Sequence, residues 1–207
     1  MDFRKSEEDL AIEASVEKFA RQEMAPLAKE LDEKGEFSME LWKKMGSLGY
    51  CGLLVDEKYG GSNLGALGTV LALQAAGRGG ADQGTCLSWA SHMVIASLNI
   101  QTWGTEEQKE KYLPRMASGE WIGAMALTEP GAGSDASSIT TRAELKGDKY
   151  ILNGTKMFIT NGPICDVVVV IARTDPSKKG ASGCTAFIVD KSMPGWYAGL
   201  PYFRIGL

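Results

Sequence analysis

The stretch Ala126-Leu127-Thr128-Glu129-Pro130-Gly131-Ala132-Gly133-Ser134-Asp135 lies in the middle of the 207-residue chain, where the sequence pattern changes. An apolar run, Ile122 to Leu127, leads into it. Its glycines can adopt positive φ angles and bring backbone N–H groups close to a ligand. The stretch therefore suits phosphate oxygens, with hydroxyls from Thr128 and Ser134 at its ends. It also suits a plain glycine turn between two strands.

The sequence before Ile122 is typical of helices. Ser6 and Ser38 each precede apolar residues at helical spacing, which predicts helices that begin at these caps. Thr105-Glu106-Glu107-Gln108 has the form of a capping box and predicts the start of another helix. Pro114 is expected to disturb the helix that follows Thr105. Because no β-branched alternating run occurs in this part, residues 1–121 are predicted to form an all-α domain. The residues expected to face its core include Ile12, Val16, Phe19, Ala20, Leu41, Trp42, Met45, Leu48, Val70, Leu71, Leu87, Val94 and Leu98.

The sequence after Ile122 is typical of strands. Asn153-Gly154 is the strongest short hairpin signal in the chain, so it predicts a turn into a strand over Lys156–Thr160. Residues 122–207 are therefore predicted to form an antiparallel, barrel-like β domain, and the fold class is multidomain α+β. The other expected strands are Ile122–Leu127, Thr140–Leu145, Tyr150–Leu152, Val167–Ala172 and Thr185–Val189.

Composition narrows the functional classes. The chain is 44% hydrophobic and 23% charged, which is enough apolar surface for a packed core. Its net charge of −4 argues against non-specific nucleic-acid binding, which needs a concentrated positive field. No apolar run reaches the roughly 20 residues that a membrane helix requires. The acidic start does not resemble a signal or transit peptide. With one histidine, His92, and four widely spaced cysteines, no metal site is expected, and the cysteines are interpreted as reduced.

Two nucleotide-binding motifs can be compared with the central stretch. A P-loop is excluded because no Gly-Lys-Ser/Thr follows the glycines. Gly131, Gly133 and Ala136 do satisfy G-x-G-x-x-A after a strand, but a dinucleotide fingerprint also requires a helix next. The residues that follow, Ser137 to Thr140, lead into strand alternation, so this match is interpreted as accidental.

The whole chain resembles the acyl-CoA dehydrogenase family. The central stretch looks like the flavin-loop signature of that family, and supporting stretches follow in family order. Tyr150-Ile151-Leu152-Asn153-Gly154 and Asn161-Gly162-Pro163 look closest to the isovaleryl-CoA and related branched- or short-chain members. The supporting stretches are Asp56–Gly61, Gln108–Met116, Tyr150–Gly162 and Ala186–Gly195.

The resemblance implies FAD as cofactor, lying against the β domain. The strand Met125–Thr128 would run beside the pyrimidine edge of the flavin, and Thr160 would place its hydroxyl next to flavin N5. Phe158 falls where many members have a tryptophan, so it keeps an apolar wall and loses the indole N–H. Ser134 would touch both a cofactor phosphate and the pantetheine arm of the substrate. The implied cofactor-binding residues are Met125, Ala126, Leu127, Thr128, Gly133, Ser134, Phe158, Ile159 and Thr160.

The resemblance also implies substrate contacts in the helical domain. Ser88, Ser91 and His92 would fall on the helix that floors the acyl pocket. A lone histidine on a helix is more often a hydrogen-bonded core or surface residue, and that alternative stays open for His92. Glu129 and Asp135 form a carboxylate pair that could serve acid–base chemistry. Loop carboxylates more commonly accept backbone N–H bonds and shape the turn.

The implied reaction is the α,β-dehydrogenation of an acyl-CoA thioester to a trans-2-enoyl-CoA, with electrons passed to an electron-transfer flavoprotein. In the family the base is a glutamate beyond the part that this chain matches, so no catalytic residue is expected here and the β domain is expected to be truncated. The full-length form is expected to be a homotetramer, cytoplasmic in a bacterium or in the mitochondrial matrix of a eukaryote. The alternatives are a non-catalytic module or subunit that needs a complementary chain, and an oxidase or flavin oxygenase on the same fold.

Overall fold

The computed structural model describes residues 4–199, which divide into two compact units that meet between Ile122 and Gly123. The last residues of the predicted β domain, 200–207, lie outside the described residues. Within residues 4–199, no helix is long and apolar enough to cross a membrane.

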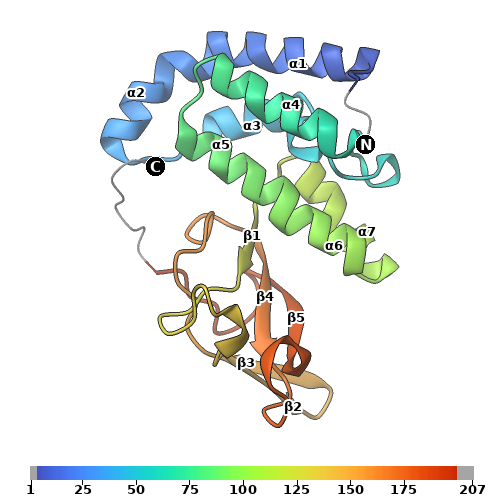
Figure 1. Ribbon diagram of the computed structural model, residues 1–207, viewed down its shortest axis with the longest axis vertical. Helices are drawn as coiled ribbons and strands as arrows, with labels where there is room; N and C mark the ends of the chain where they lie inside the picture. Colours follow the sequence, from blue (N-terminus) through green and yellow to red (C-terminus); the bar gives the residue numbers. More distant parts are fainter. Residues whose placement is uncertain (1–3, 200–207) are drawn as a thin grey trace. The chain divides into compact units, whose positions relative to one another are not determined.

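The first unit is helical, as predicted, and residues 4–122 contain no strand. Figure 1 shows α1 lying along α4. Two stretches, η1 and η4, are π-helical and continue the α-helices on either side. The elements are α1 (Glu7–Phe19), η1 (Ala20–Met24), α2 (Ala25–Lys34), α3 (Met39–Ser47), η2 (Tyr50–Gly52), η3 (Glu57–Tyr59), α4 (Gly65–Arg78), α5 (Gln83–Ala90), η4 (Ser91–Ser97), α6 (Leu98–Trp103) and α7 (Glu106–Ala117).

Side-chain caps set where these helices begin. The Ser6 hydroxyl accepts a bond from Asp9 N at 3.0 Å, and the Asp9 carboxylate accepts one from Ser6 N at 2.9 Å. Thr105 and Gln108 form the same reciprocal box at the start of α7. Such caps satisfy amides that have no partner inside the helix. The helix predicted to be disturbed at Pro114 in fact continues through it to Ala117.

The core of the helical unit differs in part from the prediction. Trp42, Trp89 and Met93 are fully buried, and both indole N–H groups donate to backbone carbonyls, those of Gly119 and Tyr50. Five side chains predicted to face the core are instead well exposed, because these helices are apolar on more than one face and the spacing alone does not determine which face is buried. The five are Leu48 at 53%, Val70 at 60%, Leu87 at 40%, Val94 at 41% and Leu98 at 36%.

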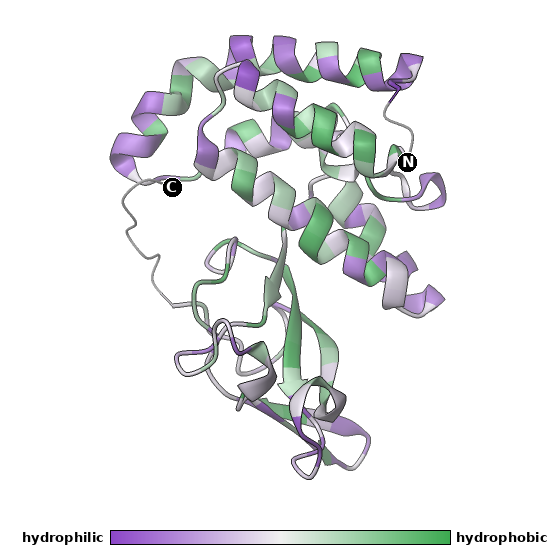
Figure 2. Cartoon of the chain, viewed as in Figure 1, coloured by the Kyte–Doolittle hydropathy of each residue, from purple (hydrophilic) through white to green (hydrophobic). Residues whose placement is uncertain are grey.

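The second unit is a sheet centred on β4, which is green along its length in Figure 2 and buried from Val167 to Val170. Strand β5 pairs with β4 antiparallel, and β2 pairs with β3 in an antiparallel hairpin. Strand β1 pairs with β4 in parallel, Gly123 opposite Val167, and β2 also meets β4 in parallel at one position. The strands are β1 (Gly123–Ala126), β2 (Arg142–Lys146), β3 (Lys149–Asn153), β4 (Val167–Arg173) and β5 (Cys184–Asp190).

The β domain predicted as antiparallel and barrel-like is thus a mixed sheet, and over residues 123–199 it is not closed. The strand predicted over Lys156–Thr160 does not form, and Asn153-Gly154 is not a hairpin turn. Gly154 is required there by packing: a Cβ on it would lie 2.7 Å from Thr141 Cα. The hairpin signal therefore marks a close approach of two backbones.

Candidate functional site

The segment that leaves β1 folds back as a tight turn. Glu129 and Ala132 exchange both backbone hydrogen bonds, at 3.0 and 3.1 Å, with Pro130 and Gly131 at the tip. Neither Gly131 nor Gly133 has a positive φ, so the conformational freedom expected of them is not used. A Cβ on either would meet nothing within 4 Å. The small residues therefore leave the outer face of this turn open to close approach by a ligand.

A second segment, residues 156–161, runs along β1 in the opposite direction. Met157 N donates to Thr128 O at 2.8 Å, and Asn161 Nδ2 donates to Gly123 O at 3.0 Å. Lys156 Nζ donates to Leu127 O at 2.8 Å. The structure thus brings together two sets of residues that the sequence analysis assigned to one cofactor, those of the β1 strand and Phe158 to Thr160.

Backbone conformation at Phe158 is unusual. Its φ is +58°, in the left-handed region that bulky residues rarely adopt, and Asn161 three residues later has a φ of +66°. Such a conformation costs on the order of 1 kcal/mol or more, and it persists only where the surroundings impose it. The Phe158 side chain is 51% exposed. A strained, exposed aromatic ring between two anchored positions is consistent with a ligand-facing wall.

The polar groups of these segments include several without a protein partner. Among the described residues, no partner bonds the N–H or hydroxyl of Thr128, those of Ser134, or the hydroxyl of Thr160. Thr128 and Thr160 are half-buried and Ser134 is exposed, so these groups are available to solvent or to a ligand. A row of donors beside an aromatic wall fits the polar edge of a flavin ring, and an open glycine turn with a hydroxyl fits a phosphate.

The two loop carboxylates are held by the protein. The Glu129 side chain is 3% exposed and accepts bonds from Thr140 N, Thr140 Oγ1, Thr141 N and Lys156 Nζ, at 2.6 to 2.9 Å. Burial raises the pKa of Glu129, but hydrogen bonds from Thr141, Lys156 and Thr140 outweigh it and hold the pKa well below the usual range. Glu129 is therefore an ionised anchor and is poorly suited to act as a base.

The Asp135 carboxylate also accepts hydrogen bonds from within the chain. Hydrogen bonds from the hydroxyls of Ser137 and Ser138 lower its pKa. These residues form η5 (Ala136–Ser138), a single 3-10 turn. Because no α-helix follows the glycines, the dinucleotide fingerprint is absent here, as expected from the sequence.

The expected substrate residues of the helical unit are all buried. Ser88 is 5% exposed, Ser91 3% and His92 0%. His92 Nε2 lies 3.1 Å from Met116 O, and the ring meets Trp42 edge-on with centroids 5.0 Å apart. Burial lowers the pKa of His92 to about 4, outweighing hydrogen bonds to the backbone of Met116 and Cys51. In this unit His92 is a neutral core residue, and an acyl contact by Ser88, Ser91 or His92 stays a prediction.

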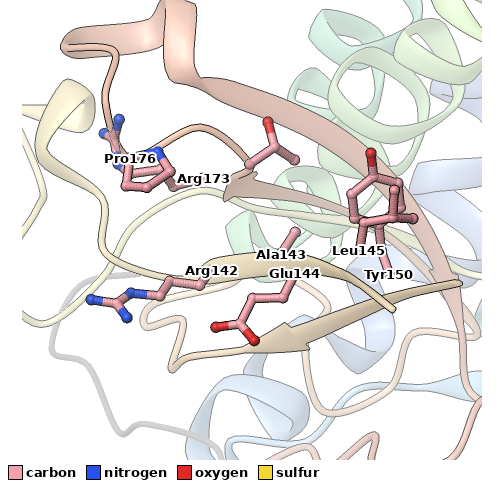
Figure 3. Close-up of a pocket in the computed structure, with 8 residues that line it drawn as sticks. Arg142, Ala143, Glu144, Leu145, Tyr150, Arg173 and Pro176 are labelled. Carbon is pink, nitrogen blue, oxygen red and sulfur yellow. The ribbon is translucent and has the colours of Figure 1, made fainter. Parts of the chain in front are cut away.

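A cavity of about 470 Å³ lies elsewhere in the β unit, between β2, β3 and the loop after β4. In Figure 3, Leu145 and Tyr150 lie together at one end of it, and Arg173 and Pro176 lie at the other. None of the expected cofactor residues lines this cavity. Arg173 is committed to backbone carbonyls, including those of Ile139 and Ser137. The expected cofactor residues therefore lie outside this cavity, on β1, the turn that follows it and residues 158–160.

One residue of the site was missed in the sequence analysis. Lys156 joins the Leu127 carbonyl to the Glu129 carboxylate, and its side chain is only 10% exposed. A lysine next to the apolar Met157-Phe158-Ile159 run was the available signal, because a lysine placed among apolar residues needs a buried partner.

Two family models match this chain, one in each unit. Residues 6–120 match the family model of the acyl-CoA dehydrogenase N-terminal domain. Residues 124–205 match that of the acyl-CoA dehydrogenase middle domain. The two models together cover nearly all of the chain.

Individual relatives are also similar to this chain over nearly all of its length. Mitochondrial isovaleryl-CoA dehydrogenase of Pongo abelii is 44% identical over 98% of this chain and 48% of its own length. A chain from a structure of the electron transferring flavoprotein of Acidaminococcus fermentans is 44% identical, with a TM-score of 0.89, over 94% of this chain and 50% of that one. A structure of PigA with FAD and proline is 38% identical, with a TM-score of 0.87, over 94% and 51%.

The chain thus spans about half the length of the relatives that it matches. Within that half, the helical unit corresponds to the N-terminal domain model and the sheet unit to the middle domain model. The chain belongs to the acyl-CoA dehydrogenase family.

Proposed function

We propose that this chain supplies the FAD-holding part of an acyl-CoA dehydrogenase. The reaction is the removal of one hydrogen each from the α and β carbons of an acyl-CoA thioester, which gives a trans-2-enoyl-CoA. The observation that carries the proposal is the set of unpartnered polar groups at Thr128, Ser134 and Thr160, on segments that hydrogen bonds hold side by side. Family membership and the FAD complex of a related protein support the same cofactor.

Each segment has a separate role in the proposed site. Met125 to Thr128 present backbone groups and one hydroxyl to the polar edge of the ring. Phe158 and Ile159 provide an apolar wall, and Thr160 a hydroxyl beside it. Gly133 and Ser134 receive a phosphate, and Ser134 also meets the pantetheine arm of the substrate. When bound, FAD supplies the two-electron acceptor for the reaction. These residues orient the ring and limit the access of water.

The wider activity rests on the same family resemblance. Electrons pass on to an electron-transfer flavoprotein, and the full-length protein assembles as a homotetramer. We assign no catalytic base to this chain, because the buried carboxylate of Glu129 is saturated with hydrogen bonds and Asp135 is bound to Ser137 and Ser138. The base, the acyl pocket and the acyl-chain preference belong to the complete enzyme.

The visible spectrum of the purified chain tests the proposal. A yellow protein whose flavin absorbance is bleached by isovaleryl-CoA or butyryl-CoA, without oxygen, would support a working dehydrogenase. A colourless chain that gains flavin colour only with a complementary chain would support the alternative of a non-catalytic module. Bleached flavin that recovers rapidly in air, with hydrogen peroxide formed, would favour an oxidase. A chain that takes up no FAD under either condition would refute the cofactor assignment.

A further inference from the structure

The interior of the β unit contains an ion pair that touches both cofactor-facing segments. Lys156 Nζ lies 2.9 Å from Glu129 Oε1, and the two side chains are 10% and 3% exposed. Ion pairs are usually found at surfaces, where they contribute little. A buried pair is costly to desolvate and is retained only with further hydrogen bonds, so its presence here requires an explanation.

The hydrogen bonds of the pair identify what it connects. The Glu129 carboxylate accepts hydrogen bonds from Thr140 N and Thr141 N, so it fixes the two residues that directly precede β2. Lys156 Nζ donates to Leu127 O as well, which ties the second segment to the end of β1. The next backbone bond, from Met157 N to Thr128 O at 2.8 Å, continues this connection.

The second segment is therefore anchored at two points along β1. Lys156 and Met157 hold one end, and the Asn161 side chain holds the other at Gly123. Phe158 to Thr160 lie between the anchors, and the strained φ of Phe158 falls inside this interval. Without the Lys156 anchor, the chain is free to relax that strain, and Phe158 and Thr160 lose a fixed position relative to Thr128.

We propose that Lys156 and Glu129 are positioning residues that set the spacing between the two cofactor-facing segments before FAD binds. This inference rests on the proposed function for the identity of the ligand, and on the geometry alone for the pre-organisation. Pre-organisation raises affinity because less ordering remains to be done when the ligand arrives. The pair touches no proposed ligand atom, so it acts through Thr128, Phe158 and Thr160.

Amide hydrogen exchange on the unmodified chain tests the pre-organisation without and with FAD. The amides of Met157, Thr140 and Thr141 are expected to exchange slowly without FAD, and FAD is expected to change their rates by less than about threefold. If these amides exchange freely without FAD and slow only when FAD is added, the ligand orders the segments and the inference is wrong.

Two single variants test the link to affinity. Lys156→Met removes the ammonium group and keeps the chain length, and Lys191→Met removes a lysine that pairs with Asp166 elsewhere in the same unit. FAD affinity is measured at a temperature where circular dichroism confirms that both are folded. Lys156→Met is expected to raise the FAD dissociation constant by about tenfold or more, and Lys191→Met by less than about twofold.

The outcomes separate the two claims. Equal FAD affinity of Lys156→Met and the unmodified chain would overturn the positioning role and leave the proposed function intact. Failure of the unmodified chain to bind FAD, both alone and with a complementary chain, would instead overturn the proposed function. If Lys156→Met does not fold, the exchange measurement on the unmodified chain decides the positioning role by itself.

Discussion

Replacing Glu129 with glutamine removes one charge from the buried pair and almost no volume. One carboxylate oxygen accepts from Thr141 N and Lys156 Nζ, and the other from the amide and hydroxyl of Thr140. The glutamine NH₂ group is least unfavourable beside Thr140, whose hydroxyl can reverse and accept. Even there the Thr140 amide loses its acceptor, and the ammonium of Lys156 loses its counter-charge.

The magnitude follows from these losses. Removing one partner of a buried ion pair typically costs about 3–5 kcal/mol. For the β unit (Gly123–Tyr202), unfolding in its own transition, that corresponds to a fall in unfolding temperature of roughly 12–40 °C. Scanning calorimetry at pH 7 is the suitable assay, because it can resolve separate transitions of the two units. Glu106→Gln is the control: Glu106 is exposed, pairs with Lys58 in the helical unit, and its loss is expected to leave the transition of the β unit unchanged.

The pH dependence of Glu129→Gln provides a second criterion. The pKa of Glu129 is lowered in the folded protein, so its stabilising effect is present above the unfolded pKa of about 4.3 and is lost as the pH falls further. The difference in stability between the unmodified chain and Glu129→Gln should be constant from pH 7 to about 5 and then shrink. A difference below about 1 kcal/mol at pH 7 would refute the reasoning, as would one that stays constant down to pH 3.

Four further outcomes are expected. In a full-length form of the protein, Thr160→Val should slow the reduction of bound flavin by acyl-CoA about 2- to 10-fold for one lost hydrogen bond. An unchanged stopped-flow rate would contradict the placement of the Thr160 hydroxyl beside the flavin ring. In urea titrations, Gly154→Ala should lower the unfolding free energy by about 1–3 kcal/mol, because the added Cβ clashes with the backbone of Thr141. Gly131→Ala is the control: its Cβ enters open space, so the unfolding free energy should change by less than about 0.5 kcal/mol. Phe158→Asn should relieve the strain of the positive φ, because asparagine adopts such angles more readily, and leave the chain as stable or up to about 1 kcal/mol more stable. The same variant should bind FAD more weakly. A loss of stability would contradict the inferred strain at Phe158. Because the pKa of His92 is lowered on folding, the unmodified chain should lose up to about 3 kcal/mol of unfolding free energy as the pH falls from 6.5 to about 4, and His92→Gln should not show this loss. Parallel curves of unfolding free energy against pH for the two chains would contradict the neutral burial of His92.

The sequence was sufficient for the order of the units and for most elements. Capping residues such as Ser6 and Thr105 and the β-branched run Val167–Val170 are local signals, and the structure confirms the helices and the strand that they predicted. The exposed positions of Leu87, Val94 and Leu98 could not be foreseen, because tertiary packing of Trp89 and Met93 chooses the buried face.

The details of the site depended on contacts between distant residues. Asn153-Gly154 carries a strong local hairpin signal, but Thr141 lies so close to Gly154 that a Cβ there would clash with it, and no hairpin turn forms. The β1 turn was located from its glycines, while the buried Lys156–Glu129 pair joins residues 27 positions apart and leaves no periodic pattern. The left-handed Phe158 has no sequence signal either, because Phe is not a residue that favours positive φ.

The most direct test of the account is an FAD titration of this 207-residue chain, followed by flavin fluorescence and visible absorbance. The account predicts saturable binding of one FAD per chain that Thr128→Val and Thr160→Val each weaken, since both hydroxyls lack a partner among the described residues. Saturable binding that neither substitution alters, or no binding either alone or with a complementary chain, would contradict the assignment of the β1 segments as the cofactor site.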